Sequence, residues 1–387
     1  MRYMILPLAG LALFVLAWMA WPAPINPPSW TAPQMRPESE AGFRADLDTA
    51  MVRTVALNRD ADSFSNGSDG LIYLGTHSGD IVRFDPNTDR STPLYESLIV
   101  DFGEPILDVV CMGPTHLAFA TRDAVYVYDK NERAYQRVSM GVTSLPHGVI
   151  SNVEASPDGT LYFIDSNRRI GQDQTVYTPA LDALENRPWG ALYAWSPQTG
   201  RTELIHDRLH SPSGLALSQD GRSIYVSEPN RFTVREVYLD EARRGQSRVV
   251  TDTLPGTPAA LHIVGDDQLV VTLEAGRNAW VVRANRHPWL ARMMSKLPSG
   301  LRPEGNTAQS AILLYDTRQD LYVGEIRPDI ADNRALTDIH ADTSGRLWTM
   351  DRKRRELIEL QARDVEAYFS PNIRFSGQPA AISAARP

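Results

Sequence analysis

The sequence is poor in the residue types that several classes of function require. Its single cysteine, Cys111, excludes an intrachain disulfide and a zinc site built from several cysteines. Because Val109 and Val110 precede it, we expect Cys111 to be a buried apolar side chain and not a reactive thiol. The chain has no Gly-Lys-Ser/Thr phosphate loop and no Gly-x-Ser-x-Gly elbow, and its histidines show no close metal-ligand spacing.

Clustered positive charge is also lacking. The 39 basic residues are outnumbered by 47 acidic ones, which gives a net charge of −8, and the basic residues are dispersed along the chain. No group of them alternates with aromatic residues, so nucleic acid is not an expected partner.

One segment has no charge at all. Met4–Trp21 is a continuous apolar run, close in length to the roughly 17–25 residues of a membrane-spanning helix. Arg2 precedes the run and no further Lys or Arg follows until Arg36, which favours a cytoplasmic amino terminus and export of the rest. We therefore expect a single-pass membrane protein whose folded part lies on the periplasmic or extracellular side. A cleaved signal sequence is the main alternative, although Trp21–Pro24 is a poor cleavage site.

These features divide the chain into four parts. Residues 1–21 are the expected anchor or signal sequence, and residues 22–50 form a proline-rich stalk with weak helical character at its end. Residues 51–369 form the folded domain, and residues 370–387 an expected disordered tail.

The folded part repeats one pattern six times: a short polar turn followed by an alternating apolar strand. The copies are Ser68–Asp85, Thr115–Asp129, Ser156–Asn167, Ser218–Leu239, Val264–Ala284 and Thr343–Leu360. Most contain Asp-Gly or a close relative, which suits a tight hairpin turn. Several short strands per unit of roughly 40–60 residues are typical of a propeller blade. The sequence thus predicts an all-β fold, a six-bladed β-propeller of four-stranded antiparallel blades.

Two further expectations concern the ends and insertions of this ring. Met51–Leu57 alternates like a strand and is expected to pair with the last blade and close the ring. His287–Pro298 is expected to be a short amphipathic helix, inserted between strands where loops control access to the channel.

Several longer motifs resemble the strictosidine-synthase-like proteins of the gluconolactonase, regucalcin and paraoxonase superfamily. Gly190–Glu228 is similar to a pattern of that family containing "PNGVALS", Thr251–Ile263 to "LPGxPDNI", and Ile150–Asn167 to "NDVxVxxDGxxYFTDS". The helix at His287–Pro298 has a counterpart at the same place in the order. Within this group, the sequence pattern most resembles that of the membrane-anchored adipocyte-type proteins. The resemblance extends, with gaps, from about Asp62 to Leu360.

The resemblance implies a hydrolase of the lactonase or arylesterase type that holds Ca²⁺ in its channel with one Glu, two Asn and one Asp. Transferred to this sequence, the metal ligands are Asp62 in place of the Glu, and Asn152. The second Asn is Ser213 and the Asp-Asn pair is Ala259-Ala260, so the resemblance predicts a weak or lost calcium site.

Other channel roles follow from the same transfer. Asp338 lies near the position of the family's late catalytic Glu and is a candidate general base. His116 and Ser213 are candidates for substrate binding. Two functions stay open: hydrolysis of an ester or lactone, or a non-catalytic propeller that binds a small molecule or a protein partner.

Overall fold

The computed structural model describes residues 18, 20–35, 43–88, 96–99, 102–139, 147–169, 178–264, 268–302, 310–318, 321–329, 332, 334–342 and 346–360. Within these ranges, no helix has both the length and the apolar character needed to cross a membrane. The expected anchor Met4–Trp21 lies outside the described residues except for Trp18, Ala20 and Trp21, and the tail 370–387 lies wholly outside them.

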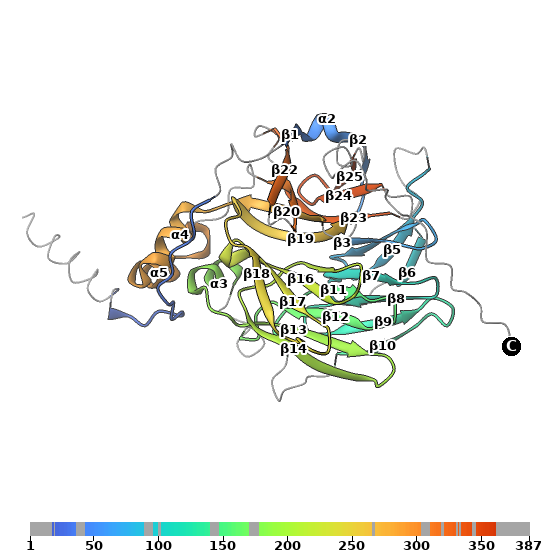
Figure 1. Cartoon of the computed structure of the whole chain (residues 1–387), viewed down its shortest axis with the longest axis horizontal. Helices are drawn as coiled ribbons and strands as arrows, with labels where there is room; N and C mark the ends of the chain where they lie inside the picture. Colours follow the sequence, from blue (N-terminus) through green and yellow to red (C-terminus); the bar gives the residue numbers. More distant parts are fainter. Residues whose placement is uncertain are drawn as a thin grey trace, which may run out of the picture. The chain divides into compact units, whose positions relative to one another are not determined.

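The described strands form six sheets, each built on four antiparallel strands, as predicted (Figure 1). Blades 1 to 3 comprise β3 (Ala61–Asn66), β4 (Ile72–Thr76), β5 (Ile81–Phe84), β6 (Glu96–Ile99); β7 (Asp108–Met112), β8 (His116–Ala120), β9 (Val125–Asp129), β10 (Ala134–Arg137); and β11 (Ile150–Ala155), β12 (Leu161–Asp165), β13 (Gly190–Ser196), β14 (Arg201–Leu209). Blades 4 and 5 comprise β15 (Leu215–Leu217), β16 (Ser223–Glu228), β17 (Thr233–Tyr238), β18 (Ser247–Thr251); and β19 (Gly256–Val264), β20 (Gln268–Gly276), β21 (Ala311–Asp316), β22 (Leu321–Arg327). Blade 6 comprises β23 (Leu336–Ala341), β24 (Leu347–Asp351), β25 (Glu356–Leu360) and β2 (Met51–Ala56).

The first strands of the six blades line the centre of the ring. Each first strand contacts that of the next blade, and β23 of blade 6 contacts β3 of blade 1, so the cycle is complete. The strand β2 pairs antiparallel with β25, which confirms the predicted closure by residues from the start of the domain. In addition, β1 (Phe43–Asp46) joins blade 5 as a fifth strand, parallel to β22, although it lies in the range expected for the stalk.

The Asp-Gly turns form for the reason predicted. Gly70, Gly159 and Gly221 have φ of 78°, 84° and 66°, the left-handed region in which glycine is least strained. The carboxylate of the preceding aspartate accepts a hydrogen bond from the backbone N–H two residues further on, for example from Thr160 to Asp158 at 2.9 Å.

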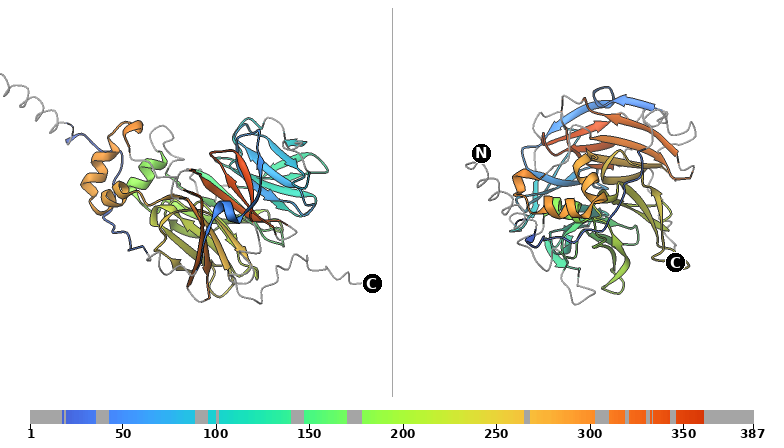
Figure 2. Two further views of the ribbon diagram at one scale, coloured as in Figure 1. Left: turned by 90° about the horizontal axis from the view of Figure 1, so that it is seen from above. Right: turned by 90° about the vertical axis from the view of Figure 1, so that its left-hand side faces the viewer.

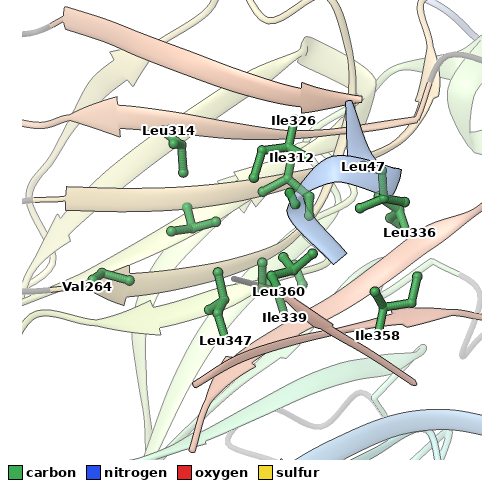
Figure 3. Packing of buried hydrophobic residues seen from close by; sticks show 13 residues of the cluster. Leu47, Val264, Ile312, Leu314, Ile326, Leu336, Ile339, Leu347, Ile358 and Leu360 are labelled. Atoms are coloured by element: carbon green, nitrogen blue, oxygen red, sulfur yellow. The ribbon is translucent and has the colours of Figure 1, made fainter. Parts of the chain in front are cut away.

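Apolar side chains fill the space between neighbouring blades. Figure 3 shows one such cluster between blades 5 and 6, with fully buried leucines and isoleucines from both sheets. Leu47, from the single turn α2 (Leu47–Ala50), completes this cluster and is 0% exposed. Since each blade buries both faces, the ring extends without needing one large core.

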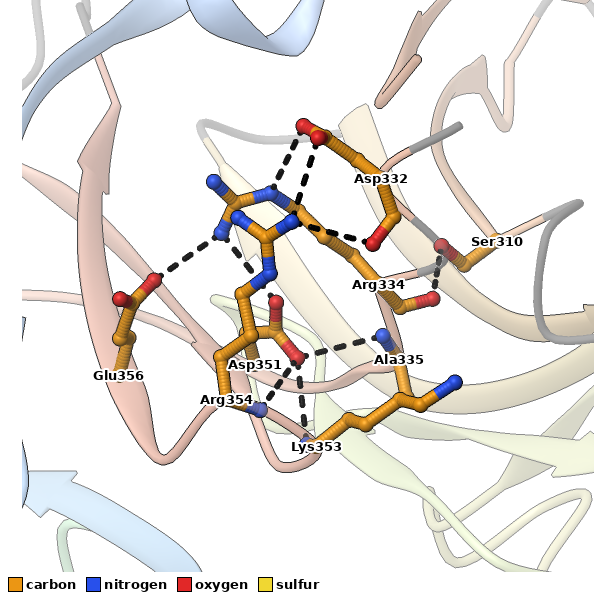
Figure 4. A network of polar contacts seen from close by, with 8 residues as sticks. All are labelled: Ser310, Asp332, Arg334, Ala335, Asp351, Lys353, Arg354 and Glu356. Atoms are coloured by element: carbon orange, nitrogen blue, oxygen red, sulfur yellow. Dashed lines mark hydrogen bonds and ion pairs between the residues drawn. The ribbon is translucent and has the colours of Figure 1, made fainter. Parts of the chain in front are cut away.

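A network around Arg334 fixes the loop that enters the first strand of blade 6 (Figure 4). The guanidinium Nη1 donates to Asp351 at 3.2 Å and to Glu356 at 3.1 Å. Asp351, which is 0% exposed, also accepts the backbone N–H of Ala335 at 3.3 Å. These contacts hold the chain three residues before Asp338.

A second compact unit comprises residues 1–32, 175–187 and 278–304, and we call its described part the helical unit (Figure 2). It holds α3 (Pro179–Glu185), α4 (Ala279–Arg286), α5 (Pro288–Ser295) and the single turn η3 (Ser299–Leu301). The helix α5 confirms the helix predicted within His287–Pro298. The extended segment before residue 32 is tied to these helices, since Trp30 N–H donates to Asn285 O at 2.8 Å.

One expectation about this region is wrong. The repeat copy Val264–Ala284 was expected to continue as strand, but Ala279–Arg286 is the helix α4. Asn278 explains the change, because its side chain accepts hydrogen bonds from Trp280 N and Val281 N and so caps a helix start. This local cap outweighs the strand preference of the apolar run Trp280, Val281 and Val282.

Candidate functional site

A cavity of about 230 Å³ opens at the end of the channel where the six first strands begin. All six blades contribute to its wall, because the first strands are copies of one unit and enter the ring at the same end. The lining residues are Asp62, Ser63, Leu107, Asp108, Ser151, Asn152, Ser213, Ala259, Ala260, Glu274, Thr337, Asp338 and Arg352.

Irregular strand pairing explains why neighbouring residues of one strand both line this cavity. The register of the first strand shifts between Ala61 and Ser63, between Ile150 and Asn152, and between Leu336 and Asp338. A regular strand would turn successive side chains to opposite faces, whereas an extra residue re-aims them. The shift therefore brings both members of pairs such as Thr337-Asp338 to the cavity.

Asp108, Asn152 and Asp338 occupy equivalent positions at the start of their strands, and each contacts the next blade. Asp108 accepts the N–H of Val153 at 2.7 Å, and Asn152 Oδ1 accepts that of Leu215 at 3.1 Å. Asp338 Oδ2 accepts the N–H of Phe64 at 3.0 Å. These side chains thus connect neighbouring blades as well as lining the cavity.

Further titratable side chains lie two residues along the same strands, facing the same channel. His340 Nε2 lies 3.2 Å from Asp338 Oδ1. The rings of His340 and His262 meet edge to face at 5.8 Å, and His262 Nε2 accepts the N–H of Ala341 at 3.2 Å. With Glu154 from β11, they form a partly buried group of acids and bases below the carboxylates that line the cavity.

The surroundings move the pKa values of this group in both directions. Burial raises the pKa of Asp108 to about 8, and the negative charge of Asp338 adds to the effect. Burial likewise raises the pKa of Glu154 to about 7. Burial alone lowers the pKa of His340, but the charge and hydrogen bond of Asp338 outweigh it and raise the value to about 9. Burial and the charge of His340 lower the pKa of His262 to about 3.

At neutral pH these shifts leave a defined pattern of protons. His340 is a cation beside Asp338, and His262 is neutral, which agrees with its role as hydrogen-bond acceptor. Asp108 retains its proton, so the cavity presents a neutral carboxylic acid.

Arg352 places a positive charge at the wall of the cavity. Its guanidinium pairs with Asp62 Oδ1, while Asp62 Oδ2 lies 3.3 Å from His77 Nδ1. The Asp62 side chain is 7% exposed and that of Arg352 is 50% exposed. The carboxylate transferred as a metal ligand is thus already neutralised by a cation from blade 6.

Blades 4 and 5 lie so close together at Gly214 and Ala259 that no side chain there can reach into the cavity as a metal ligand. A Cβ on Gly214 would lie 2.1 Å from the carbonyl oxygen of Ala259. That oxygen accepts a hydrogen bond from Ser227 Oγ at 2.7 Å, and Ser213 Oγ lies 3.3 Å from it. The two serine hydroxyls bridge the space between the blades. The hydroxyl of Ser213 is therefore already used in hydrogen bonds to Ser227 and to the backbone of blade 5.

The side chains present do not fit a calcium ion, which prefers about six to eight oxygen ligands. Asp62 is paired with Arg352, Asn152 Oδ1 is bound to a backbone N–H, and Ala259 and Ala260 carry no side-chain oxygen. Across the described residues, no group of three or more His, Cys, Asp or Glu side chains is arranged to hold a metal.

Four of the five predicted site residues meet in the cavity: Asp62, Asn152, Ser213 and Asp338. Their functional roles stay predictions. His116 does not join them, and its expected place in the channel is wrong. It begins β8 and pairs with Met112, whereas Asp108 pairs with Ala120, so antiparallel pairing puts His116 at the far end of the blade. There it contacts Asp129, 3.4 Å away.

Five residues of this region were not predicted from the sequence: Asp108, Arg352, Glu154, His262 and His340. A signal existed for Asp108, because Asp108-Val109 repeats the two-residue pattern of Asn152-Val153 and Asp338-Ile339. Arg352 gave no comparable signal, since it lies within a run of charged residues typical of an exposed hairpin turn.

The chain is similar in sequence to one protein family and to several curated proteins. The family model described as SMP-30/Gluconolactonase/LRE-like region matches residues 62–286, more than half of the chain. The protein "Adipocyte plasma membrane-associated protein Hemomucin" of Drosophila melanogaster is 26% identical over 208 residues, which covers 48% of this chain and 34% of the relative. "Protein STRICTOSIDINE SYNTHASE-LIKE 7" of Arabidopsis thaliana is 26% identical over 246 residues, 61% of this chain and 62% of the relative.

A fungal relative carries the name of an enzyme. "Lactonohydrolase oryL" of Aspergillus oryzae is 20% identical over 181 residues, which covers 44% of this chain and 40% of the relative. The chain therefore spans less than two thirds of the length of each of these curated relatives.

Solved structures show the same fold at low identity. A gluconolactonase from Xanthomonas campestris superposes with a TM-score of 0.55 and 12% identity, covering 88% of this chain and 99% of its own. A regucalcin from Agrobacterium tumefaciens, described as a calcium-binding protein, gives a TM-score of 0.53 and 12% identity, covering 83% and 95%. At this identity the likeness shows the propeller fold alone.

Proposed function

The chain belongs to the SMP-30/gluconolactonase/LRE-like family, and on that premise we propose that its channel cavity hydrolyses a small ester or lactone. The observation that carries the proposal is that Asp108 and Asp338, from blades 2 and 6, line one cavity. Its volume of about 230 Å³ is below the roughly 300–1,000 Å³ of pockets for drug-sized ligands, so the substrate is small. The lactonohydrolase among the relatives supports the same reaction class.

The two aspartates supply an acid and a base. Asp338, whose Oδ1 lies 3.2 Å from His340 Nε2, accepts a proton from a water molecule that attacks the carbonyl carbon. Asp108, which holds its proton at neutral pH, donates it to the alkoxide that leaves when the C–O bond breaks. Proton transfer from Asp338 to Asp108 through water then restores the starting state.

We assign to Arg352 the stabilisation of the negative charge that develops during the reaction. Its guanidinium lies at the cavity wall and has donors beyond the one that contacts Asp62. It is therefore able to stabilise the negative oxygen that develops on the carbonyl. No step of this scheme passes through a divalent cation, because the donor set does not fit one.

A second candidate is a non-catalytic propeller that binds a small molecule or a protein. The contacts of Asp108, Asn152 and Asp338 favour it, since each one accepts a backbone N–H of the next blade. Those contacts alone give these side chains a structural reason to be present.

Hydrolysis of phenyl acetate and simple lactones by the full chain, with a chelator present, separates the two. For the hydrolase we expect turnover with chelator, a fall in kcat/KM as the pH rises through about 8, and a loss of about 100-fold or more in Asp338→Asn. The matched control is Asp220→Asn, which changes an aspartate in an exposed turn. Turnover abolished by the chelator contradicts the scheme, and no turnover together with ligand-induced stabilisation supports the binding protein.

We further propose that Met4–Trp21 anchors the chain in a membrane with the propeller exported, so that ester, lactone or protein partners meet it outside the cytoplasm. The charge of Arg2 before the run supports this orientation. A reporter fused after Pro387 is expected to be active only outside the cytoplasm. A mature protein that begins near Ala23 would show a cleaved signal sequence instead.

A further inference from the structure

The helical unit exposes apolar side chains to a degree that the described part of the propeller does not. The four most exposed large apolar residues of the described chain all belong to this unit: Trp21 (72%), Leu301 (68%), Trp280 (63%) and Trp289 (63%). Scattered exposed apolar residues are ordinary, but three tryptophans in one small unit mark an interaction surface.

The same unit carries the opposite charge to the chain as a whole. Its described residues include six cations and two carboxylates, namely Arg187, Arg283, Arg286, Arg292, Lys296 and Arg302 against Asp182 and Glu185. Both carboxylates are buried, at 3% and 0% exposure. The outer surface of this unit is therefore cationic, although the chain has a net charge of −8.

Helical spacing puts the tryptophans and the cations together. In α4, Trp280 is followed three residues later by Arg283, and in α5, Trp289 is followed three residues later by Arg292. Residues three apart share one face of a helix, and all four of these side chains are exposed. Arg292 Nη2 donates a hydrogen bond to the side-chain oxygen of Asn26 at 3.0 Å, and this neutral partner leaves the positive charge of Arg292 uncancelled.

We propose that this face of the helical unit lies against a membrane surface rich in anionic lipid. Tryptophan rings favour the level of the lipid headgroups, and arginine side chains bind their phosphates. The sequence agrees, since the apolar run Met4–Trp21 ends where the described residues of this unit begin. Lys296 Nζ donates to the carbonyl oxygen of Trp18 at 2.8 Å and lies 5.8 Å from the centre of its ring.

The proposal goes beyond the hydrolase and does not need it. The channel can prove inactive while the helical unit still contacts lipid, and each is measured separately. A protein partner with an acidic surface is the competing occupant, and the test below is chosen to distinguish it.

Full-length protein labelled with 5-fluorotryptophan is reconstituted in lipid nanodiscs, with and without phosphatidylserine, that carry a nitroxide on the lipid headgroup. The ¹⁹F signals are assigned with Trp280→Phe and Trp289→Phe, which change exposed rings and should leave the melting temperature unchanged. We expect the nitroxide to broaden the signals of Trp280 and Trp289 when phosphatidylserine is present. The signal of Trp348, which is 0% exposed in blade 6, is the internal control.

A second experiment removes single positive charges from the helical unit. Each of Arg283→Gln and Arg292→Gln should lower the equilibrium constant of the contact about fivefold, as expected for one basic residue near an anionic surface. Glu203→Gln, an exposed change in the propeller, is the matched control and should have no effect. Equal broadening of Trp280, Trp289 and Trp348 in every nanodisc would overturn the proposal, and would assign the face to water or a protein partner.

Discussion

The channel of the propeller and the helical unit place their ionisable side chains in opposite environments. Asp108 and Asp338 are 4% and 7% exposed, and backbone N–H groups or a histidine satisfy their oxygens. Arg283 and Arg286 stand on the outside of α4, where solvent surrounds them. The first pair belongs to the folded framework, and the second pair is available to a partner.

This difference in burial predicts whether a charged side chain affects folding stability or association with a partner. A buried charge changes the free energy of unfolding, because its partners lose their only counterpart when it is removed. An exposed charge contributes little to folding and acts mainly on association. The predictions below test this separation, in order of decreasing effect on stability.

Asp338→Ala should have the largest effect, a loss of about 3–5 kcal/mol in the free energy of unfolding. The substitution leaves the His340 cation and the backbone N–H of Phe64 without their acceptor inside the ring. Urea denaturation measures it, with Asp220→Ala in an exposed turn as the control. A loss below about 1 kcal/mol would show that the channel carboxylate is not part of the framework.

Stability should fall as the pH rises from about 6.5 to about 9. The folded protein keeps protons on Asp108, with its pKa raised to about 8, and on His340, raised to about 9, that the unfolded chain has released. The change is on the order of a few kcal/mol, since one pKa unit corresponds to about 1.4 kcal/mol. Glu154 adds to the fall up to about pH 7, whereas His262 costs stability only below pH 6.5.

Asp108→Asn provides the matched test of that profile. The variant lacks the proton whose loss weakens the native state, so its stability should fall less steeply between pH 6.5 and 8 than that of the wild type. Chemical denaturation at pH 6.5, 8 and 9.5 measures both slopes. Parallel curves for the two proteins would refute the raised pKa of Asp108.

Calcium should have a smaller effect. Millimolar calcium is expected to leave the melting temperature of the wild type unchanged, because Arg352 already neutralises Asp62. In Arg352→Gln the Asp62 carboxylate loses its arginine partner, and calcium at its dissociation constant should add about 0.4 kcal/mol. A tight, stoichiometric site in the wild type would show that other oxygens of the channel bind the ion.

Arg286→Gln in the helical unit should have the smallest effect on folding, within about 0.5 kcal/mol, because the side chain is exposed at the end of α4. Urea denaturation of the variant beside Asp338→Ala compares the two regions directly. A loss above about 1 kcal/mol would give this charge a structural role and break the comparison.

The motifs of the sequence located most of the cavity but misjudged single side chains. Asp62, Asn152, Ser213 and Asp338 were identified by transfer from the family motifs, and they meet because equivalent positions of a repeat lie at one end of a ring. His116 was misplaced because a strand's direction within its blade decides which end it faces. Arg352 was missed because a charged turn gives no sign of which residue bends towards the channel.

The helical insertion illustrates the same limit. The helix predicted within His287–Pro298 formed, because proline at its first position and the apolar spacing are local features. The preceding Ala279–Arg286 was misread as strand, since a short apolar run such as Trp280, Val281 and Val282 fits both structures. Only the cap at Asn278 separates the two.

The sequence by itself determined the six-bladed ring and its closure by a strand that begins at Met51, because turn residues and alternation are properties of neighbours along the chain. The tertiary structure decided the protonation of Asp108, the pairing of Asp62 with Arg352, and the gathering of tryptophans and arginines on the helical unit. Those depend on burial and on charges brought together from distant segments, and a linear sequence records neither.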